Sequence, residues 1–239
     1  MKFKSSLTEA VLLKRHYRFL AEIALQNKRR RMIYCPNLGS LKQCDILGSR
    51  IWFSNPLRLS QGCLDIWELT EVNGGWLVAI NPSEADTLVR EAVELGVIPE
   101  LSGFQYVQAP IIPRLGNGIE LLIKDNGEQC FIHVEPILNG DDRNEASFPT
   151  VKGEGMNALN ELLVLKENGH RVILIYCIQH NGVCGLRPAD RVDPHYGRLL
   201  REAIAKGIEV IAYRAFITLE EARLGTRIPI LLSENIISG

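Results

Sequence analysis

The 239-residue chain is nearly neutral, with 27 Lys and Arg against 28 Asp and Glu, and 46% of its residues are hydrophobic. This composition is ordinary for a globular protein of one or two domains and excludes an intrinsically disordered chain. The longest apolar run, Val172–Ile178, is far shorter than the roughly 20 residues of a membrane span, and the sequence does not open on a signal-peptide pattern. We therefore expect a cytoplasmic protein without membrane association.

Positive charge is concentrated in the first quarter of the sequence. Residues 1–60 hold twelve Lys and Arg but only three Asp and Glu, whereas residues 61–170 hold six basic and eighteen acidic residues. A basic segment can bind a polyanion of any sequence by releasing its condensed counterions. Nucleic acid is therefore the first partner to expect. Alternatively, the acidic part of the chain belongs to a regulatory module that recruits a basic protein.

The cysteines have no spacing that indicates a metal site or a disulfide framework. They are scattered and include no CxxC pair: Cys35, Cys44, Cys63, Cys130, Cys177 and Cys184. We expect buried free thiols.

The first 81 residues contain short segments rich in β-branched and aromatic residues, separated by Gly, Pro, Asn and Ser. This pattern predicts a small all-β barrel. The expected strands are Ala10–Ala24, Arg31–Tyr34, Arg50–Phe53, Trp67–Glu71 and Trp76–Ile80. Asn81-Pro82-Ser83 then supplies a turn and a helix cap, so we place a domain boundary between residues 81 and 82.

The densest charge run of the barrel is Lys28-Arg29-Arg30-Arg31, at an expected hairpin tip. With Arg15 and Arg18 it would form a phosphate-contacting surface. The alternative is a solvated turn. The nearby aromatic residues either belong to the core or stack on bases: Tyr17, Tyr34, Trp52 and Phe53.

From residue 82 to residue 239, helical and strand patterns alternate, which favours a sheet covered by helices. The expected helices are Glu84–Leu95, Gly153–Asn168 and Tyr196–Lys206. The expected strands are Tyr106–Ile112, Gly118–Lys124, Gln129–Ile137, Arg171–Ile178 and Ile208–Ala215, with an edge strand at Ile228–Leu232. The whole chain is thus predicted to be α+β.

Asp125-Asn126-Gly127 marks a β-hairpin, because Asn and Gly tolerate the positive φ of a type I′ turn. With a two-residue loop, Asp125 pairs with Glu128 and Glu120 pairs with His133. Glu120, His133 and Glu135 then meet on one face of the hairpin. Two carboxylates and an imidazole resemble a divalent-metal site, whereas the alternative is a solvated outer face.

Several motifs along nearly the whole chain together carry a family resemblance. They are Arg18-Phe19-Leu20-Ala21, Cys35-Pro36-Asn37-Leu38-Gly39, Trp67-Glu68-Leu69, Glu100-Leu101-Ser102-Gly103-Phe104, Phe148-Pro149, Asp193-Pro194, Glu202-Ala203 and Gly207–Tyr213. In order and spacing the chain resembles the sugar fermentation stimulation protein A family of bacterial DNA-binding proteins. The resemblance implies an N-terminal OB-like barrel followed by an α/β domain of the PD-(D/E)xK nuclease fold.

The nuclease motifs of that family are altered in this chain. The family's first motif reads Ser-Arg-Ile-Asp and its second reads Glu-Val-Lys; the Asp and Glu bind the metal, and the Lys lies beside the attacking water. In this chain Glu120 replaces the Asp, and His133-Val134-Glu135 replaces Glu-Val-Lys. Mg²⁺ disfavours a nitrogen ligand, and a carboxylate at residue 135 repels the scissile phosphate. The loop after Phe148-Pro149 is one residue shorter and lacks the family's Arg; Lys152 is the one basic residue there that could replace the lost Lys.

We therefore expect a DNA-binding protein with little sequence preference, connected through its family with sugar metabolism, whose nuclease-like domain is inactive and needs no cofactor. The expected nucleic-acid-binding residues are Arg15, Arg18, Lys28, Arg29, Arg30, Arg31 and, from the resemblance, Asn37. The alternative is a DNA endonuclease that uses Mn²⁺ or another transition ion at Glu120, His133 and Glu135.

Overall fold

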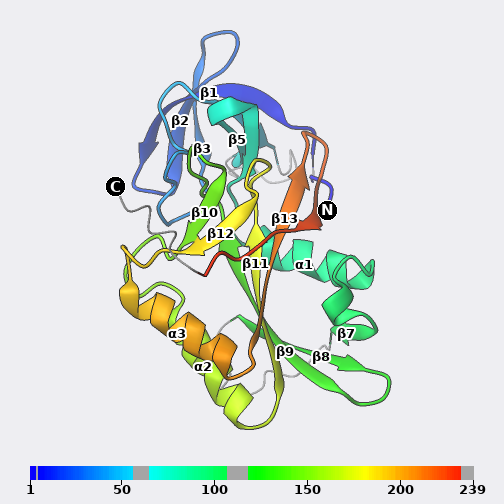
Figure 1. The fold of residues 1–239 in the computed structure, drawn as a ribbon. Coiled ribbons are helices and arrows are strands. Elements are labelled where there is room, and N and C mark those ends of the chain that lie inside the picture. Colours follow the sequence, from blue (N-terminus) through cyan, green and yellow to red (C-terminus); the bar gives the residue numbers. More distant parts are fainter. Residues whose placement is uncertain (4, 56–64, 107–117, 233–239) are drawn as a thin grey trace.

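A six-stranded antiparallel sheet opens the fold in the computed structural model, which describes all residues except 4, 56–64, 107–117 and 233–239 (Figure 1). Its strand order is β3-β2-β1-β4-β5-β6, and a pairing of β3 with β5 closes the first five strands into a barrel. The strands are β1 (Thr8–His16), β2 (Leu20–Ala24), β3 (Arg30–Tyr34), β4 (Arg50–Ser54), β5 (Ile66–Val72) and β6 (Trp76–Ala79). The predicted barrel is confirmed.

The single strand predicted over Ala10–Ala24 is wrong, because β1 and β2 are separate strands joined by a turn. Tyr17 and Arg18 adopt φ of 48° and 67° in this turn, a region that side chains other than Gly rarely enter. The turn contains no Gly, Pro or Asn, so the sequence shows one uninterrupted strand-like pattern across it. The basic run lies where it was predicted, with Lys28 and Arg29 in the β2–β3 turn and Arg30 opening β3.

A second six-stranded sheet forms the rest of the fold, in the order β14-β13-β11-β9-β8-β7. The three central strands β9, β11 and β13 are parallel, and antiparallel strands flank them. Its strands are β7 (Phe104–Tyr106), β8 (Ile119–Lys124), β9 (Gln129–Ile137), β11 (Arg171–Ile178), β13 (Glu209–Ile217) and β14 (Ala222–Arg227). A small parallel pair, β10 (Glu145–Phe148) with β12 (Gly185–Pro188), lies beside this sheet (Figure 1).

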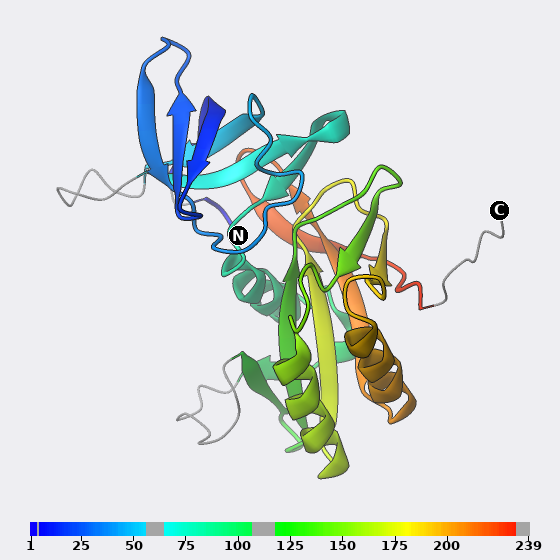
Figure 2. The ribbon, with the colours of Figure 1, turned by 90° about the vertical axis from the view of Figure 1, so that its left-hand side faces the viewer.

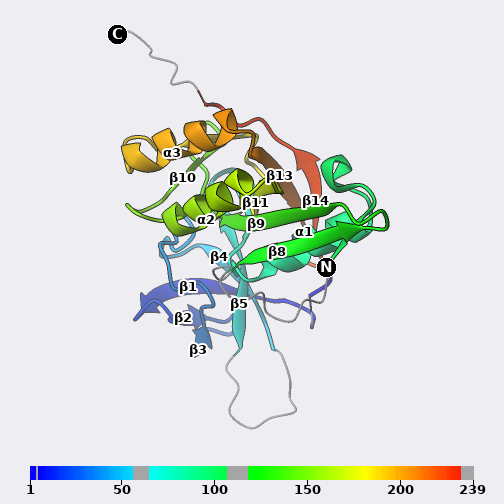
Figure 3. The same ribbon diagram turned by 90° about the horizontal axis from the view of Figure 1, so that it is seen from below.

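Helices cover both faces of the second sheet, as the alternating pattern predicted. Helix α1 (Glu84–Glu94) packs against one face, whereas α2 (Met156–Glu167) and α3 (Pro194–Ala205) pack against the other (Figure 3). Two short 3₁₀ turns are present at Asn73–Gly75 and Pro99–Leu101. None of the helices in the described part of the chain has the length and apolar character needed to cross a membrane.

Three strands were not predicted, and one predicted strand is absent. β10, β12 and β14 are short, Gly185 opens β12 and Gly225 lies inside β14, so their sequences lack a strand pattern. Ile228–Leu232 forms no strand; its one bridge pairs Ile230 with Leu186. The strand expected over Tyr106–Ile112 lies largely outside the described residues, as do Arg58, Cys63 and Asn117.

The predicted register of the β8–β9 hairpin is wrong by one residue. Ile119 pairs with His133 and Glu120 with Ile132. The cause is the turn, which has three residues instead of two: the Lys124 N–H donates to the Glu128 carbonyl, and Gly127 takes φ of 85°. A three-residue loop with a left-handed Gly is the next most common hairpin connection after the two-residue turn. Because side chains alternate along a strand, this shift puts Glu120 and His133 on opposite faces.

The barrel and the second domain share core contacts at their junction (Figure 2). Trp52, Leu69 and Ala79 of the barrel belong to the same apolar cluster as α1. The boundary at residues 81 and 82 stays a prediction. Of the five cysteines in the described ranges, Cys35, Cys44, Cys130 and Cys177 are buried free thiols as expected, whereas Cys184 is exposed.

We predict that Gly155→Ala destabilises the fold by about 3 kcal/mol or more, because a methyl group there has no space. Gly155 has φ of 74° at the start of α2, and a Cβ would lie 2.7 Å from the buried ring of Phe148 and 3.0 Å from that of Tyr196. Backbone strain and overpacking then add. Gly153→Ala is the matched control: its φ is 84° but a Cβ would have open space, so the cost is about 1–2 kcal/mol. Urea unfolding measures both, and equal losses would contradict the packing argument.

Candidate functional site: a cleft between the barrel and the second sheet

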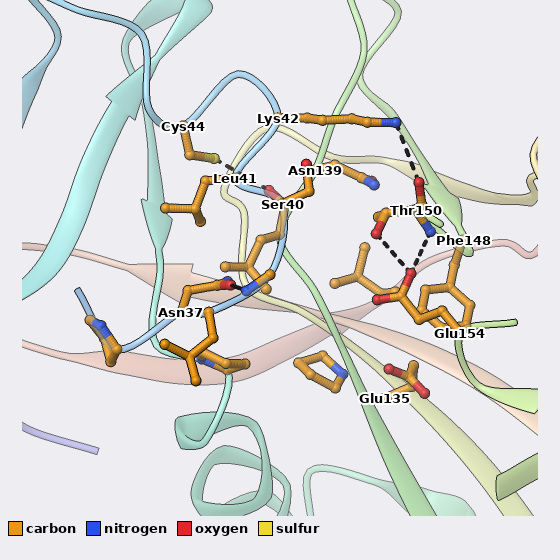
Figure 4. Close-up of a pocket in the computed structure, with 17 residues that line it drawn as sticks. Asn37, Ser40, Leu41, Lys42, Cys44, Glu135, Asn139, Phe148, Thr150 and Glu154 are labelled. Atoms are coloured by element: carbon orange, nitrogen blue, oxygen red, sulfur yellow. Dashed lines mark hydrogen bonds between the residues drawn. The ribbon is translucent and has the colours of Figure 1, made fainter. Parts of the chain in front are cut away.

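A cleft of about 390 Å³ lies between the barrel and the second domain (Figure 4). The barrel contributes the loop of residues 36–44, with Asn37, Ser40 and Lys42. The opposite wall comes from the end of β9 and the segment before α2, with Glu135 and Glu154 among its polar groups. A neighbouring cavity of about 410 Å³ shares the wall residues 39–42 and extends the cleft outward to Arg18. The site thus combines the basic barrel with an acidic interior.

Arg15 does not face solvent, although the sequence assigned it to DNA binding. Its guanidinium donates to three backbone carbonyl groups, those of Arg18, Asn37 and Gly39, and lies 3.3 Å from a carboxylate oxygen of Asp45. The side chain is only 12% exposed. Because its donors are committed to these acceptors, Arg15 holds the β1–β2 turn against the 37–39 loop and is not placed to bind phosphate.

Asn37, the residue expected in the cleft from the family resemblance, does line it but is itself buried. Its Oδ1 accepts a 2.8 Å hydrogen bond from the N–H of Gly39, and its carbonyl accepts from Arg15. These bonds fix the loop by the local side-chain geometry common in Asn turns. Its first role in this structure is therefore to shape the cleft wall.

His133 and Glu135 share one face of β9 and contact each other. The Nδ1 of His133 donates to the carbonyl of Gly118 at 2.8 Å, and its Nε2 lies 3.4 Å from a carboxylate oxygen of Glu135. Burial lowers the pKa of His133, but the Glu135 and Gly118 hydrogen bonds outweigh that effect and raise the pKa overall. Burial raises the pKa of Glu135, with His133 opposing the shift. An imidazolium–carboxylate pair is the arrangement that satisfies both groups.

Glu120 belongs to a different cluster. Its carboxylate lies 2.6 Å from the guanidinium of Arg90 in α1, and that guanidinium stacks on the ring of Tyr106 at 3.9 Å. Burial raises the pKa of Glu120, and Arg90 opposes the shift. The predicted meeting of Glu120 with His133 and Glu135 is therefore wrong, because the hairpin register turns Glu120 toward α1.

The residues present do not fit a nuclease metal centre. Mg²⁺ requires near-octahedral oxygen ligands, and the adjacent donors are one imidazole nitrogen and one carboxylate. A transition ion in a catalytic site commonly has three protein ligands. Within the described ranges, no group of three His, Cys, Asp or Glu side chains converges in a way that could hold a metal ion.

Lys152 does not line the cleft and is exposed in the loop before α2. Glu154 faces the cleft instead. Its Oε2 accepts from the N–H of Thr150 at 2.6 Å and from the Thr150 hydroxyl at 2.7 Å (Figure 4). It also accepts from the N–H of Val151 at 3.2 Å. The carboxylate therefore organises the shortened loop. The cleft is lined by two acidic groups, Glu135 and Glu154, and by one basic residue, Lys42.

The basic run of the barrel divides into paired and unpaired cations. Arg30 lies 3.1 Å from Glu22, and Arg31 pairs with Asp65. Lys28 and Arg29 are exposed, and neither has an acidic partner among the residues that the structure describes. Only part of the predicted phosphate-binding run is therefore available for an external anion.

The aromatic residues also divide into two groups. Trp52 and Phe53 are buried core residues, whereas Tyr17 is 83% exposed and Tyr34 is 37% exposed. Phe19 was not among the aromatic residues expected to stack on bases; it is 43% exposed and lies beside Tyr17. Lys42 was missed as well. The signal available in the sequence was Tyr17-Arg18-Phe19 itself, two aromatic residues around an Arg in the middle of an otherwise alternating segment.

Comparison with known proteins identifies the family. The model described as "Sugar fermentation stimulation protein RE domain" matches residues 83–221, and that described as "SfsA N-terminal OB domain" matches residues 13–78. The chain belongs to the sugar fermentation stimulation protein family. A family homolog from Pseudomonas paraeruginosa is 39% identical, and one from Teredinibacter turnerae is 36% identical, each over 97% of this chain and 100% of the relative.

The fold of the sugar fermentation stimulation family extends to a solved structure. SfsA of Pyrococcus furiosus, described as a complex with Ca²⁺, superposes with a TM-score of 0.82 over 97% of this chain and 98% of its own, at 20% sequence identity. The expected fold, an OB barrel followed by an α/β domain, is confirmed.

We predict that Glu135→Gln lowers the pKa of His133, because the carboxylate that stabilises the imidazolium is lost while burial remains. An NMR titration of the His133 ring protons measures this shift. Glu120→Gln is the matched control, since Glu120 is directed toward Arg90, and it should leave the His133 titration unchanged. A His133 pKa that does not respond to Glu135→Gln would show that the two side chains are not coupled.

Proposed function

We propose that this protein binds DNA through phosphate contacts from its OB barrel. The observation that carries the proposal is a group of exposed barrel cations with no acidic partner in the described part of the chain, among them Lys14, Arg18, Lys28, Arg29 and Lys42. Unpaired, solvated cations release counterions from a polyanion without first breaking an internal ion pair. Phosphate contacts carry no sequence information, so we expect little sequence preference.

The second domain, in this proposal, does not cleave DNA with Mg²⁺. Where the resemblance places the family's catalytic Lys, this chain has Glu135, whose carboxylate lies beside His133. A carboxylate repels a phosphodiester at the position where a cation would stabilise developing negative charge. The alternative nuclease with a transition ion at Glu120, His133 and Glu135 is disfavoured by the pairing of Glu120 with Arg90.

The name of the relatives, sugar fermentation stimulation protein homolog, connects the family with sugar fermentation. We extend the proposal accordingly: the chain takes part in the control of sugar metabolism as a DNA-binding protein. The name supports this step, and the residues support only the binding of DNA.

We predict that Lys28→Gln/Arg29→Gln weakens DNA binding equally for unrelated sequences and reduces the slope of log K against log[salt] by about 2, one for each lost phosphate contact. Fluorescence anisotropy with labelled duplexes at several salt concentrations measures the slope. The matched control is Arg191→Gln/Arg198→Gln, which removes two exposed cations near and within α3 and should leave the slope unchanged. Equal effects of both pairs would place the binding surface elsewhere.

We also predict that the purified protein does not nick supercoiled plasmid with Mg²⁺, Mn²⁺ or Zn²⁺ faster than its Glu120→Ala variant does. Gel analysis of plasmid topology measures the rate. A nicking activity that is present in the wild type and lost in Glu120→Ala would contradict the proposal and favour the metal-dependent endonuclease. A trace activity that survives both Glu120→Ala and His133→Ala would identify a contaminant.

A further inference from the structure

We propose that the β1–β2 turn is a stacking platform for single-stranded DNA; this inference rests on the proposed function. Tyr17 and Phe19 lie at the tip of the turn with ring centroids 6.2 Å apart and an angle of 27° between the ring planes. Tyr17 exposes 83% of its surface to solvent, which is unusual for a large aromatic side chain. Exposed aromatic rings beside cations are the recurring means by which proteins bind single strands without reading their sequence.

The turn is held in place rather than loose. Arg15 donates two hydrogen bonds to the carbonyl of Arg18, at 3.1 and 2.9 Å. The same guanidinium also donates to carbonyls of the 37–39 loop, so it ties the turn to that loop. Tyr17 and Arg18 both keep positive φ, which side chains other than Gly adopt only where the surrounding structure enforces it. A platform ordered before binding loses less conformational entropy when a base stacks on it.

The adjoining outer face of the barrel continues the platform. His16 pairs with Leu20, and Leu20 pairs with Tyr34, so these three side chains share a face next to the tip. Tyr34 is 37% exposed and provides a third ring. Two acidic residues lie on this side of the barrel and both are paired: Glu22 is 3.1 Å from Arg30, and Glu9, farther from the tip, is 3.0 Å from Arg50. The row therefore presents apolar surface without a free carboxylate against the phosphates.

Charge complementarity sets the path of the strand. Lys14 and Arg18 flank the platform, and Lys42 lies with Arg18 on the wall of the outer part of the cleft. Glu154 lies on the wall of both cavities, and Asp45 on the outer wall is within 3.3 Å of Arg15. Farther in, Glu135 lines the cleft, and the carboxylates of Glu135 and Glu154 repel phosphates. Phosphates are thus attracted to the rim and excluded from the interior. A duplex, whose bases are stacked inside, cannot use the aromatic rings, so the platform selects the single strand.

The test compares binding of a single-stranded oligonucleotide of about 15 nucleotides, within the usual span of one OB fold, with binding of the matching duplex. In Tyr17→Asn the ring is lost while Asn tolerates the positive φ, so the turn keeps its conformation. We expect single-strand affinity to fall roughly 5- to 150-fold and duplex affinity to change little. Phe216→Ala, which removes a 51% exposed ring from β13, is the matched control and should change neither. Tyr17→Trp should retain binding, and its emission should be quenched by the single strand.

The outcomes separate the two proposals. Failure to bind either form of DNA would overturn the proposed function and with it the platform. Salt-sensitive binding in which Tyr17→Asn leaves single-strand affinity unchanged, or in which Phe216→Ala lowers it equally, would overturn the platform and leave DNA binding in place. Circular dichroism and urea unfolding of each variant verify that the change lies in binding and not in folding.

Discussion

The guanidinium of Arg15 is the interaction on which the arrangement of the site depends. It joins the carbonyl of Arg18 in the β1–β2 turn to the carbonyls of Asn37 and Gly39 in the loop that walls the cleft. An Arg fork can satisfy several acceptors at once, and buried carbonyls without a donor would be costly. One side chain thus fixes the exposed aromatic tip on one side and the shape of the cleft on the other.

This use of Arg15 explains why a charge count overstates the basic surface of the barrel. The sequence shows a strongly basic first quarter, but Arg30 and Arg31 pair with Glu22 and Asp65, and Arg50 pairs with Glu9 and Glu71. Those carboxylates come from other strands or, for Asp65, from the residue before β5, so no local sequence pattern reveals the pairs. Of the cations left over, Arg18, Lys28 and Arg29 lie in turns. Lys14 lies in β1 opposite Glu22, whose carboxylate is within 3.1 Å of Arg30. The sequence therefore gives the charge of the barrel, but it does not show which of the basic side chains form internal ion pairs.

The fold was more predictable than the site for a similar reason. Helices α1, α2 and α3 bury apolar residues at three- and four-residue spacing, Asp193 caps α3, and β11 is an apolar run, so local rules suffice. The site depended on the β8–β9 register, and Asn126-Gly127 is compatible with either a two-residue or a three-residue loop. The structure chooses the longer loop, in which Asn126 Oδ1 accepts from the Glu128 N–H at 3.0 Å. A difference of one residue in one turn separates Glu120 from His133.

The changes at residues 133 and 135 are best understood as a coupled pair. The family pattern at these positions, Glu-Val-Lys, places an anion before a cation, and His133-Val134-Glu135 places a cation before an anion. The sum of the charges is conserved when His133 is protonated, so the half-buried strand avoids the cost of an unpaired ion. The order of the positive and the negative side chain along the strand is reversed. A single change of Lys to Glu in the pattern that the resemblance implies would have left two adjacent carboxylates, which repel each other, whereas the double change keeps an oppositely charged pair on the strand. Because the charges of His133 and Glu135 compensate each other, the strand that lines the cleft keeps a stable charge pair without an external ion. Under the proposed function, the phosphate-binding surface therefore lies on the barrel and not at this pair.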